Sequence, residues 1–262
     1  YLHVSPRDLL LNPLHVKQQR IVADIEQVCL KERQNNHPEF NRLWSERVTS
    51  YQAAVTQLLG GEISSTGERC TEPYVAFQLA DRIPSGHALF LGNSTPIRDF
   101  DRYAFWTTEK ELLVGANRGA SGIDGLVATA VGFAEGHQRP TTVVLGDLSC
   151  LHDLNSLILV KNSKVPISVV VINNQAGGIF DMLPIAARTD IFEQYFATPH
   201  PFGFRYAAEM FGLPYRLVET RQDLQQAFQW MVDANESFLI EVKTERGRNR
   251  EMRQRISELL AK

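Results

Sequence analysis

The fold is decided by Thr141–Ser149 (TTVVLGDLS) together with Val165–Asn174 (VPISVVVINN). Thr141–Leu145 and Val165–Ile172 are β-branched and almost continuously apolar, which predicts two parallel strands that are buried on both faces. Leu151–Lys161 lies between them and carries apolar residues at helical spacing. A strand, a helix and a second strand form a βαβ unit, whose ligands gather beyond the carboxyl ends of the strands.

Each of these strands is followed directly by an oxygen-bearing side chain. Asp147 follows the first strand, and Asn174 ends the Asn173-Asn174 pair that follows the second. Carboxylate and amide oxygens suit Mg²⁺, which keeps few protein ligands and completes its shell with water and phosphate oxygens. The two strand ends therefore predict a metal ion that bridges a diphosphate to Asp147 and Asn174.

The chain after Glu72 alternates between strands and helices, which predicts an α/β fold built on a doubly wound parallel sheet. Loops that carry Ser94 and Arg98, and then the glycines of Gly115–Gly125, are expected between these elements. The expected helices are Tyr74–Arg82, Leu126–Glu135, Tyr206–Phe211 and Arg221–Asn235, and the expected strands are Ala88–Leu91, Leu112–Val114, Tyr215–Val218 and Phe238–Val242.

The chain before residue 62 has a different pattern. Tyr1–His15 reads as an irregular or extended piece, Val16–Arg33 has helical apolar spacing, and Phe40–Leu59 reads as a polar-faced helix that Gly60-Gly61 stops. We expect residues 1–61 to be the tail of a preceding linker domain with a connecting helix, and residues 62–262 to be a second domain.

Composition excludes several classes of protein. The chain has 262 residues, of which 44 % are hydrophobic and 22 % charged, as in ordinary globular proteins. A net charge of -3 argues against a nucleic-acid binder, and no run of residues approaches a membrane span or a secretion leader. Cys29, Cys70 and Cys150 lack paired spacing, so we expect small buried side chains in a cytoplasmic protein.

Two arginines in the predicted loops suggest an acidic substrate. The guanidinium groups of Arg98 and Arg118 can each bind a carboxylate through two hydrogen bonds, and Ser94 lies four residues before Arg98. The alternative for each arginine is a solvated surface group. Gly119, Gly122 and Gly125 lack the spacing of a dinucleotide fingerprint, and tight turns are the alternative explanation for them.

The Asp147 and Asn173-Asn174 pattern resembles the Mg²⁺ and diphosphate motif of the thiamine-diphosphate enzymes, Gly-Asp-Gly followed some thirty residues later by Asn-Asn. Leu148 replaces the second glycine of that motif. Within this superfamily the closer resemblance is to the synthases of menaquinone biosynthesis. It rests on further blocks in the same order: Gly92–Arg98 (GNSTPIR), Asn117–Gly125 (NRGASGIDG), Gly146–Ser149 (GDLS), Leu151–Asn155 (LHDLN) and Asn173–Phe180 (NNQAGGIF).

The resemblance implies roles for the residues of these blocks. Mg²⁺, or Mn²⁺ in its place, would be held by Asp147, Asn174 and the backbone carbonyl of Ala176. Ile123 would brace the bent thiamine diphosphate. For Ile179, Phe180 and Leu183, the alternative to a role in the pocket is ordinary packing in the core. The remaining implied cofactor contacts are Gly146, Leu148, Ser149, Gly177, Gly178, Ile179 and Phe180, and the implied substrate contacts are Ser94, Arg98, Arg118, Phe180 and Leu183.

The resemblance also implies an activity and a missing part. Such a synthase decarboxylates 2-oxoglutarate and adds the remaining unit to isochorismate, as a homodimer or homotetramer. An activating glutamate comes from the amino-terminal domain of a neighbouring subunit, which nothing in this chain resembles, so we expect the chain to be inactive alone. Two alternatives stay open: a related enzyme that acts on smaller 2-oxo acids, and a non-catalytic cofactor-binding subunit.

Overall fold

The computed structural model describes residues 2–5, 19–22, 38–60, 67–106, 110–233 and 235–260. Contacts divide the chain into two compact units, Tyr1–Ser50 and Tyr51–Lys262. Helix α2 (Pro38–Gly60) is shared between them, in agreement with the helix predicted at Phe40–Leu59. The domain boundary predicted after residue 61 stays a prediction.

The first unit contains a pair of short parallel strands, β1 (Leu2–Ser5) and β2 (Gln19–Val22). The helix expected over Val16–Arg33 is therefore wrong at residues 19–22, and the rest of that range lies outside the described residues. Ile21 and Val22 are β-branched residues that suit a strand, and pairing with β1 outweighs the helical spacing around them.

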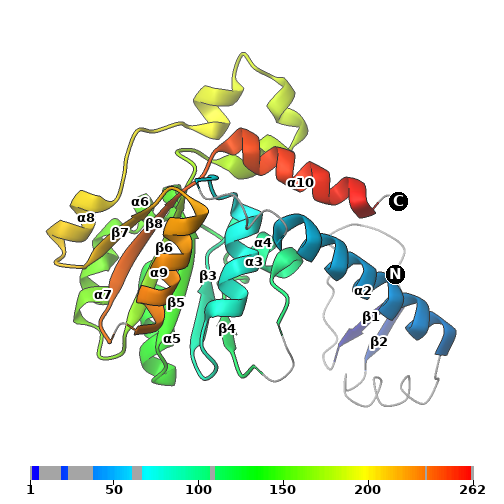
Figure 1. Cartoon of the computed structure of the whole chain (residues 1–262), viewed down its shortest axis with the longest axis horizontal. Coiled ribbons are helices and arrows are strands. Elements are labelled where there is room, and N and C mark those ends of the chain that lie inside the picture. Colours follow the sequence, from blue (N-terminus) through cyan, green and yellow to red (C-terminus); the bar gives the residue numbers. More distant parts are fainter. Residues whose placement is uncertain are drawn as a thin grey trace. The chain divides into compact units, whose positions relative to one another are not determined.

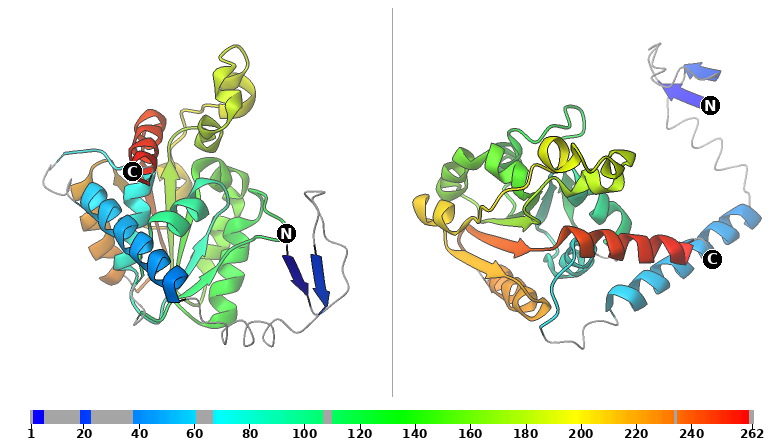
Figure 2. Two further views of the ribbon diagram at one scale, coloured as in Figure 1. Left: turned by 90° about the vertical axis from the view of Figure 1, so that its right-hand side faces the viewer. Right: turned by 90° about the horizontal axis from the view of Figure 1, so that it is seen from above.

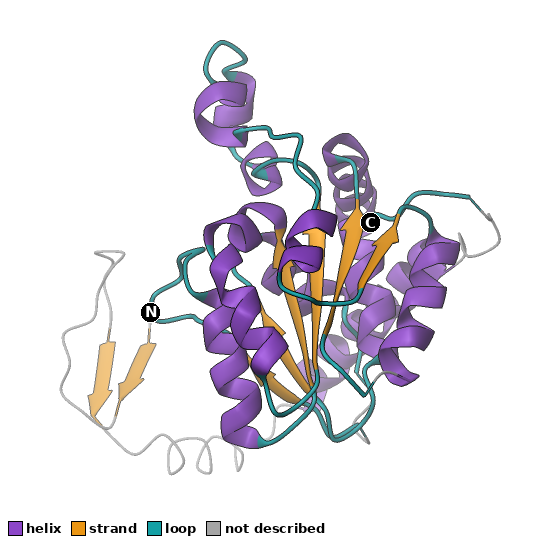
Figure 3. Cartoon of the chain, turned by 90° about the vertical axis from the view of Figure 1, so that its left-hand side faces the viewer, coloured by secondary structure: helices purple, strands orange, loops and turns teal. Residues whose placement is uncertain are grey.

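The second unit is built on one six-stranded, fully parallel sheet in the order β4-β3-β5-β6-β8-β7. This confirms the predicted doubly wound sheet, which Figure 3 shows with helices on both sides. Each predicted strand is present, with ends shifted by two residues at most. The strands are β3 (Ala88–Leu91), β4 (Leu113–Gly115), β5 (Thr141–Gly146), β6 (Ile167–Asn173), β7 (Tyr215–Val218) and β8 (Phe238–Lys243).

Helices cover both faces of this sheet because alternate strand side chains point to opposite sides (Figure 1). Leu89, Val144 and Val170 belong to the core on one face, with helices α3, α4 and α9, whereas Phe90 and Val143 belong to the core on the other, with α5, α7 and α8. The helices are α3 (Glu72–Arg82), α4 (Thr95–Tyr103), α5 (Leu126–His137), α6 (Asp147–His152), α7 (Leu157–Asn162), α8 (Arg205–Met210), α9 (Arg221–Asp233) and α10 (Arg246–Leu260).

Two predicted segments differ from the structure. Arg98 lies in helix α4 and not in a loop. The single helix expected over Leu151–Lys161 is broken: α6 begins at Asp147, a 3₁₀ turn spans Leu154–Ser156, and α7 follows. The break falls at Asp153, whose carboxylate accepts hydrogen bonds from the backbone N–H groups of Val127 (2.7 Å) and Ala128 (3.1 Å) at the start of α5. A tertiary contact therefore ends α6.

The order of the strands places a crevice between β3 and β5. The chain leaves β3 toward β4 at the sheet edge and returns to β5 on the opposite side of β3. Ligands of open α/β sheets bind at the carboxyl ends of such neighbouring strands. The segment after β6, which contains short 3₁₀ and π turns at Gly178–Met182, Pro184–Ala187 and Glu193–Ala197, extends beyond the same ends of the strands (Figure 2).

The structure bears on two expectations drawn from composition, the state of the cysteines and the lack of a membrane span. Cys70 and Cys150 are buried free thiols, as predicted, and Cys29 lies outside the described residues. Within the described ranges, every helix is too short or too polar to cross a membrane.

Candidate cofactor site

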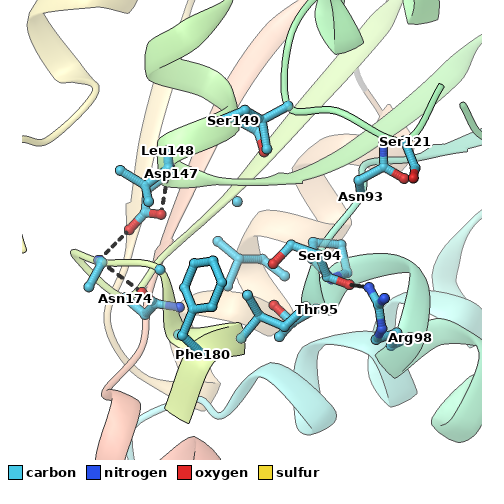
Figure 4. Close-up of a pocket in the computed structure, with 18 of the residues that line it drawn as sticks. Asn93, Ser94, Thr95, Arg98, Ser121, Asp147, Leu148, Ser149, Asn174 and Phe180 are labelled. Atoms are coloured by element: carbon cyan, nitrogen blue, oxygen red, sulfur yellow. Dashed lines mark hydrogen bonds between the residues drawn. The ribbon is translucent and has the colours of Figure 1, made fainter. Parts of the chain in front are cut away.

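A cavity of about 320 Å³ lies in the crevice between β3 and β5. Figure 4 shows Asp147 and Asn174 on one side of this cavity and Ser94, Thr95 and Arg98 on another. Of the residues predicted to form the site, Leu183 alone does not line the cavity, and it is 48 % exposed. The cavity is lined by Asn93, Ser94, Thr95, Pro96, Arg98, Arg118, Ser121, Ile123, Gly146, Asp147, Leu148, Ser149, Ile172, Asn174, Ala176, Gly177, Gly178, Ile179 and Phe180.

Asp147 and Asn174 converge on one backbone group. The N–H of Ala176 donates to Oδ1 of Asn174 at 3.0 Å and to Oδ2 of Asp147 at 3.2 Å. Gln175 makes this possible because it has a φ of 62°, which turns the chain sharply after β6. The carboxylate and amide oxygens of two neighbouring strand ends are thus brought together at the cavity wall.

Asp147 is almost fully buried, at 2 % exposure. Burial raises the pKa of its carboxyl to about 7, although hydrogen bonds from backbone N–H groups, including that of Leu148, oppose the shift. Nε2 of His200, which has no hydrogen-bond partner among the described residues, lies 3.4 Å from Oδ2 of Asp147. Nδ1 of His200 accepts a hydrogen bond from the N–H of Phe202, and burial lowers the pKa of the imidazole.

A buried polar network lies behind Asn174. Nδ2 of Asn174 donates to Oε1 of Glu72 at 2.7 Å, and Glu72 is 1 % exposed. Asn249 and Arg253 of α10 also bond to Glu72, and Arg253 bonds to Asp99 of α4 as well. Burial alone would lower the pKa of Arg253, but Glu72 and Asp99 together raise it above its usual range. The network ties α3, α4 and α10 to the amide at the cavity.

The glycine pair after Asn174 is required by the surrounding chain. A Cβ at Gly178 would lie 2.7 Å from Nδ2 of Asn174, and a Cβ at Gly177 would lie 3.0 Å from the ring of Phe180 and from the carbonyl oxygen of Phe196. Neither position accommodates a side chain without displacing a neighbour. The pair therefore keeps the backbone close to the Asn174 amide.

The opposite wall follows β3 and the glycine-rich loop. Ser94 has a φ of 75°, an uncommon conformation for a residue with a side chain, and its carbonyl oxygen accepts a hydrogen bond from Arg98 Nη1 at 2.6 Å. Arg118 Nη1 donates to Oδ1 of Asn93 at 2.7 Å, while Nδ2 of Asn93 donates to the carbonyl of Gly122. Asn93 thus holds the loop of residues 116–125 against the end of β3.

The donors around Asp147 suit the metal that the sequence predicts. The described residues contain no group of three or more His, Cys, Asp or Glu side chains arranged to hold a metal ion. A cation beside Asp147 would instead meet carboxylate, amide and backbone oxygens, which are the donors that Mg²⁺ prefers. The buried carboxylate of Asp147 would also gain a positive partner for its ionised form. These residues fit a hard divalent ion.

Sequence reasoning missed several residues of the site. Thr95 and Asn93 lie inside a block that was singled out, but neither was given a role. Glu72 reads as a helix-start residue before Pro73, and His200 reads as an isolated loop histidine, so neither carries a local signal. Conversely, His152, which is half exposed and 3.6 Å from Asp124, lies outside the cavity.

Comparison with known proteins gives the family. The model of the thiamine pyrophosphate enzyme C-terminal TPP binding domain matches residues 100–242, which is more than half of the chain. The chain belongs to this family. The cavity, including Asp147, Asn174 and the glycine pair, lies largely within the matched residues, and Asn93–Pro96 and Arg98 precede them.

Relatives within this family are named 2-succinyl-5-enolpyruvyl-6-hydroxy-3-cyclohexene-1-carboxylate synthase. The synthase of Rubrobacter xylanophilus is 41 % identical over 257 residues, covering 95 % of this chain and 43 % of the relative. That of Chlorobium phaeovibrioides is 46 % identical over 171 residues, covering 65 % and 29 % respectively. That of Chlorobaculum tepidum is 43 % identical over 197 residues, covering 75 % and 32 %. The chain thus spans less than half the length of these relatives.

A solved structure has the same fold. The thiamine diphosphate-dependent 4-hydroxybenzoylformate decarboxylase of Rhodococcus jostii RHA1 superimposes with a TM-score of 0.56 at 22 % identity, over 70 % of this chain and 34 % of that one. At this identity the likeness concerns the fold alone.

Proposed function

We propose that the chain is the cofactor-binding part of a thiamine-diphosphate-dependent synthase that consumes 2-oxoglutarate and isochorismate in menaquinone biosynthesis. The observation that carries the proposal is the convergence of Asp147 and Asn174 on the N–H of Ala176 beside the cavity. The names of the relatives support the choice of substrates.

In the proposed site, Asp147, Asn174 and the backbone carbonyl of Ala176 hold Mg²⁺, which Mn²⁺ can replace. Ile123 would support the cofactor, and Ile179 and Phe180 would exclude water from the pocket. When bound, thiamine diphosphate supplies a nucleophilic carbon and accepts the electrons that decarboxylation releases. The backbone and side chains proposed to contact the cofactor are Gly146, Leu148, Ser149, Gly177 and Gly178.

Arg98 and Arg118, on the opposite wall, are proposed to bind the carboxylates of the substrates. Arg98 and Arg118 line the same cavity as Asp147, and so does Ser94, which follows β3 in the chain. Both arginines now bond to neutral oxygens of this chain, Ser94 O and Asn93 Oδ1, so each retains donors for an acidic ligand. Leu183 lies in the segment beyond the strands, outside the cavity lining, and is also proposed to contact substrate.

The activating glutamate and the remaining substrate contacts are proposed to come from an amino-terminal domain of a neighbouring subunit in a homodimer or homotetramer. The partial coverage of the relatives supports this arrangement. The reaction is proposed to take place in the cytoplasm.

The test is a substrate panel with the complete polypeptide that the gene encodes. We expect loss of 2-oxoglutarate that depends on isochorismate, thiamine diphosphate and Mg²⁺, and an Arg118→Lys variant should raise the KM for an acidic substrate because lysine cannot form the two-pronged contact. Preferential use of pyruvate, or no turnover of any 2-oxo acid, would contradict the proposed substrates.

A further inference from the structure

Glu72 is a deeply buried charged group behind the proposed metal site. Its side chain is 1 % exposed, and it does not line the cavity. Oε1 accepts hydrogen bonds from Nδ2 of Asn174 at 2.7 Å and from Nδ2 of Asn249 at 2.9 Å, while Oε2 faces Arg253 at 2.5 Å. A charged residue that is this buried and fully bonded is unusual outside an ion pair or a site.

The contact with Glu72 decides how the amide of Asn174 is oriented. A carboxylate only accepts hydrogen bonds, and a backbone N–H only donates them. Asn174 lies between the two, with Glu72 on one side and the N–H of Ala176 on the other. Only the orientation with Nδ2 toward Glu72 and Oδ1 toward Ala176 satisfies both neighbours. The reverse orientation would place two oxygens together on one side and two N–H groups together on the other.

We propose that Glu72 is a positioning residue that locks the amide of Asn174 with its oxygen toward the metal site. The inference rests on the proposed function, because it needs Asn174 to be a metal ligand. A flipped amide would present an NH₂ group to the cation, and such a group is no ligand for Mg²⁺. Glu72 acts from behind the site, through Asn174, and touches neither metal nor substrate.

The position of Arg253 makes the carboxylate of Glu72 irreplaceable by glutamine. In a Glu72→Gln variant the guanidinium of Arg253 would attract the amide oxygen of the new side chain and repel its NH₂ group. The NH₂ group would then face Nδ2 of Asn174. Two donors cannot bond to each other, so the Asn174 amide would be driven to flip.

The chain offers a matched control for this variant. Asp99 is also buried, at 2 % exposure, and bonds to the same Arg253, but among the described residues no hydrogen bond joins it to Asn174. Asp99→Asn therefore removes a buried negative charge from the same ion-pair cluster and leaves the acceptor for Asn174 in place. A loss that arises only from weakening the cluster should occur in both variants.

A compensating second substitution distinguishes a change in the orientation of the Asn174 amide from a general loss of structure. In a Glu72→Gln/Asn174→Asp double variant, the new glutamine can donate to one carboxylate oxygen of residue 174 while the other remains available to the metal. We therefore expect Glu72→Gln to weaken metal binding when residue 174 is asparagine, and to leave it unchanged or strengthen it when residue 174 is aspartate.

The measurement is the affinity for Mn²⁺ in the presence of thiamine diphosphate, by electron paramagnetic resonance, in the complete polypeptide. We expect Glu72→Gln to weaken binding by at least about tenfold, as for loss of a hydrogen bond to a charged group. Asp99→Asn should stay within about twofold of wild type, a change too small to reflect a lost hydrogen bond, and the double variant should bind more tightly than Glu72→Gln alone.

Three results would overturn the inference: wild-type affinity in Glu72→Gln, an equal loss in Asp99→Asn, or a double variant no better than the single one. If Glu72→Gln does not fold, the comparison of Asn174→Asp with the double variant decides, and a weaker double variant refutes the inference. Absence of Mn²⁺ binding in the wild type would overturn the proposed function itself, which distinguishes the two failures.

Discussion

Gly178 lies so close to Asn174 that a side chain at position 178 would displace the Asn174 amide. Because a Cβ at residue 178 would lie 2.7 Å from Nδ2 of Asn174, a Gly178→Ala variant must push the amide or the turn aside. We expect the affinity for Mg²⁺ and thiamine diphosphate to fall by about tenfold, equivalent to about 1.4 kcal/mol. Isothermal titration calorimetry of the complete polypeptide measures the change.

A second glycine provides the control for this prediction. A Cβ at Gly132 on helix α5 would meet no described atom within 4 Å outside its chain neighbours and the backbone of its own helix, and the position is exposed. Gly132→Ala should leave cofactor affinity unchanged and, as a helix-interior replacement, should not reduce stability. Equal affinities in Gly178→Ala and wild type would show that the amide tolerates displacement.

Single residues were predictable from the sequence where their chemistry was local. Asp147 and Asn174 could be paired because both directly follow buried parallel strands. Glu72 and His200 could not, since their contacts with Asn174 and Asp147 join segments that are far apart in the sequence and follow no motif. Leu183 follows a block of cavity residues but does not line the cavity, and its contact with substrate stays a prediction.

At the scale of elements, Asp153 connects two helices. Its Oδ2 accepts the N–H groups of Val127 and Ala128 at the start of α5, and its Oδ1 accepts the hydroxyl of Ser156. Asp153→Ala leaves the first turn of α5 without this acceptor, so we expect a loss of about 1–2 kcal/mol in the free energy of unfolding. Urea denaturation followed by circular dichroism measures it.

A Ser156→Ala variant distinguishes the capping of α5 by Asp153 from the hydrogen bond between Ser156 and Asp153. It removes only the hydroxyl donor and keeps the carboxylate at the start of α5, so its effect should be smaller than that of Asp153→Ala. Equal losses in the two variants would place the stabilisation in the turn between α6 and α7 rather than in the cap of α5.

The sequence predicted the elements that depend on local pattern and missed the helix break that depends on the Asp153 contact. The strands of the sheet were predicted because continuous β-branched runs depend on burial alone. The break between α6 and α7 was not, because its cause is a contact with α5, and apolar spacing over Leu151–Lys161 continues through the break. Helix α4 was missed for a related reason: Ser94 and Pro96 read as a loop, yet proline in the first turn is compatible with a helix.

At the scale of the whole molecule, the chain holds only part of the proposed site. It spans 43 % or less of the three named synthases. We predict that residues 1–262 alone bind thiamine diphosphate weakly and show no turnover, because the activating glutamate is proposed to lie in another domain. Steady-state assays of the isolated chain and of the complete polypeptide test this, and robust turnover by the isolated chain would refute it.

The most direct measurement of the central claim is calorimetric titration of the complete polypeptide with thiamine diphosphate, with and without Mg²⁺. In the wild type we predict binding that depends on Mg²⁺. Asp147→Ala should abolish that dependence, whereas Asp124→Ala, which removes an exposed carboxylate outside the cavity, should retain it. Mg²⁺-dependent binding of wild-type strength in Asp147→Ala would contradict the account.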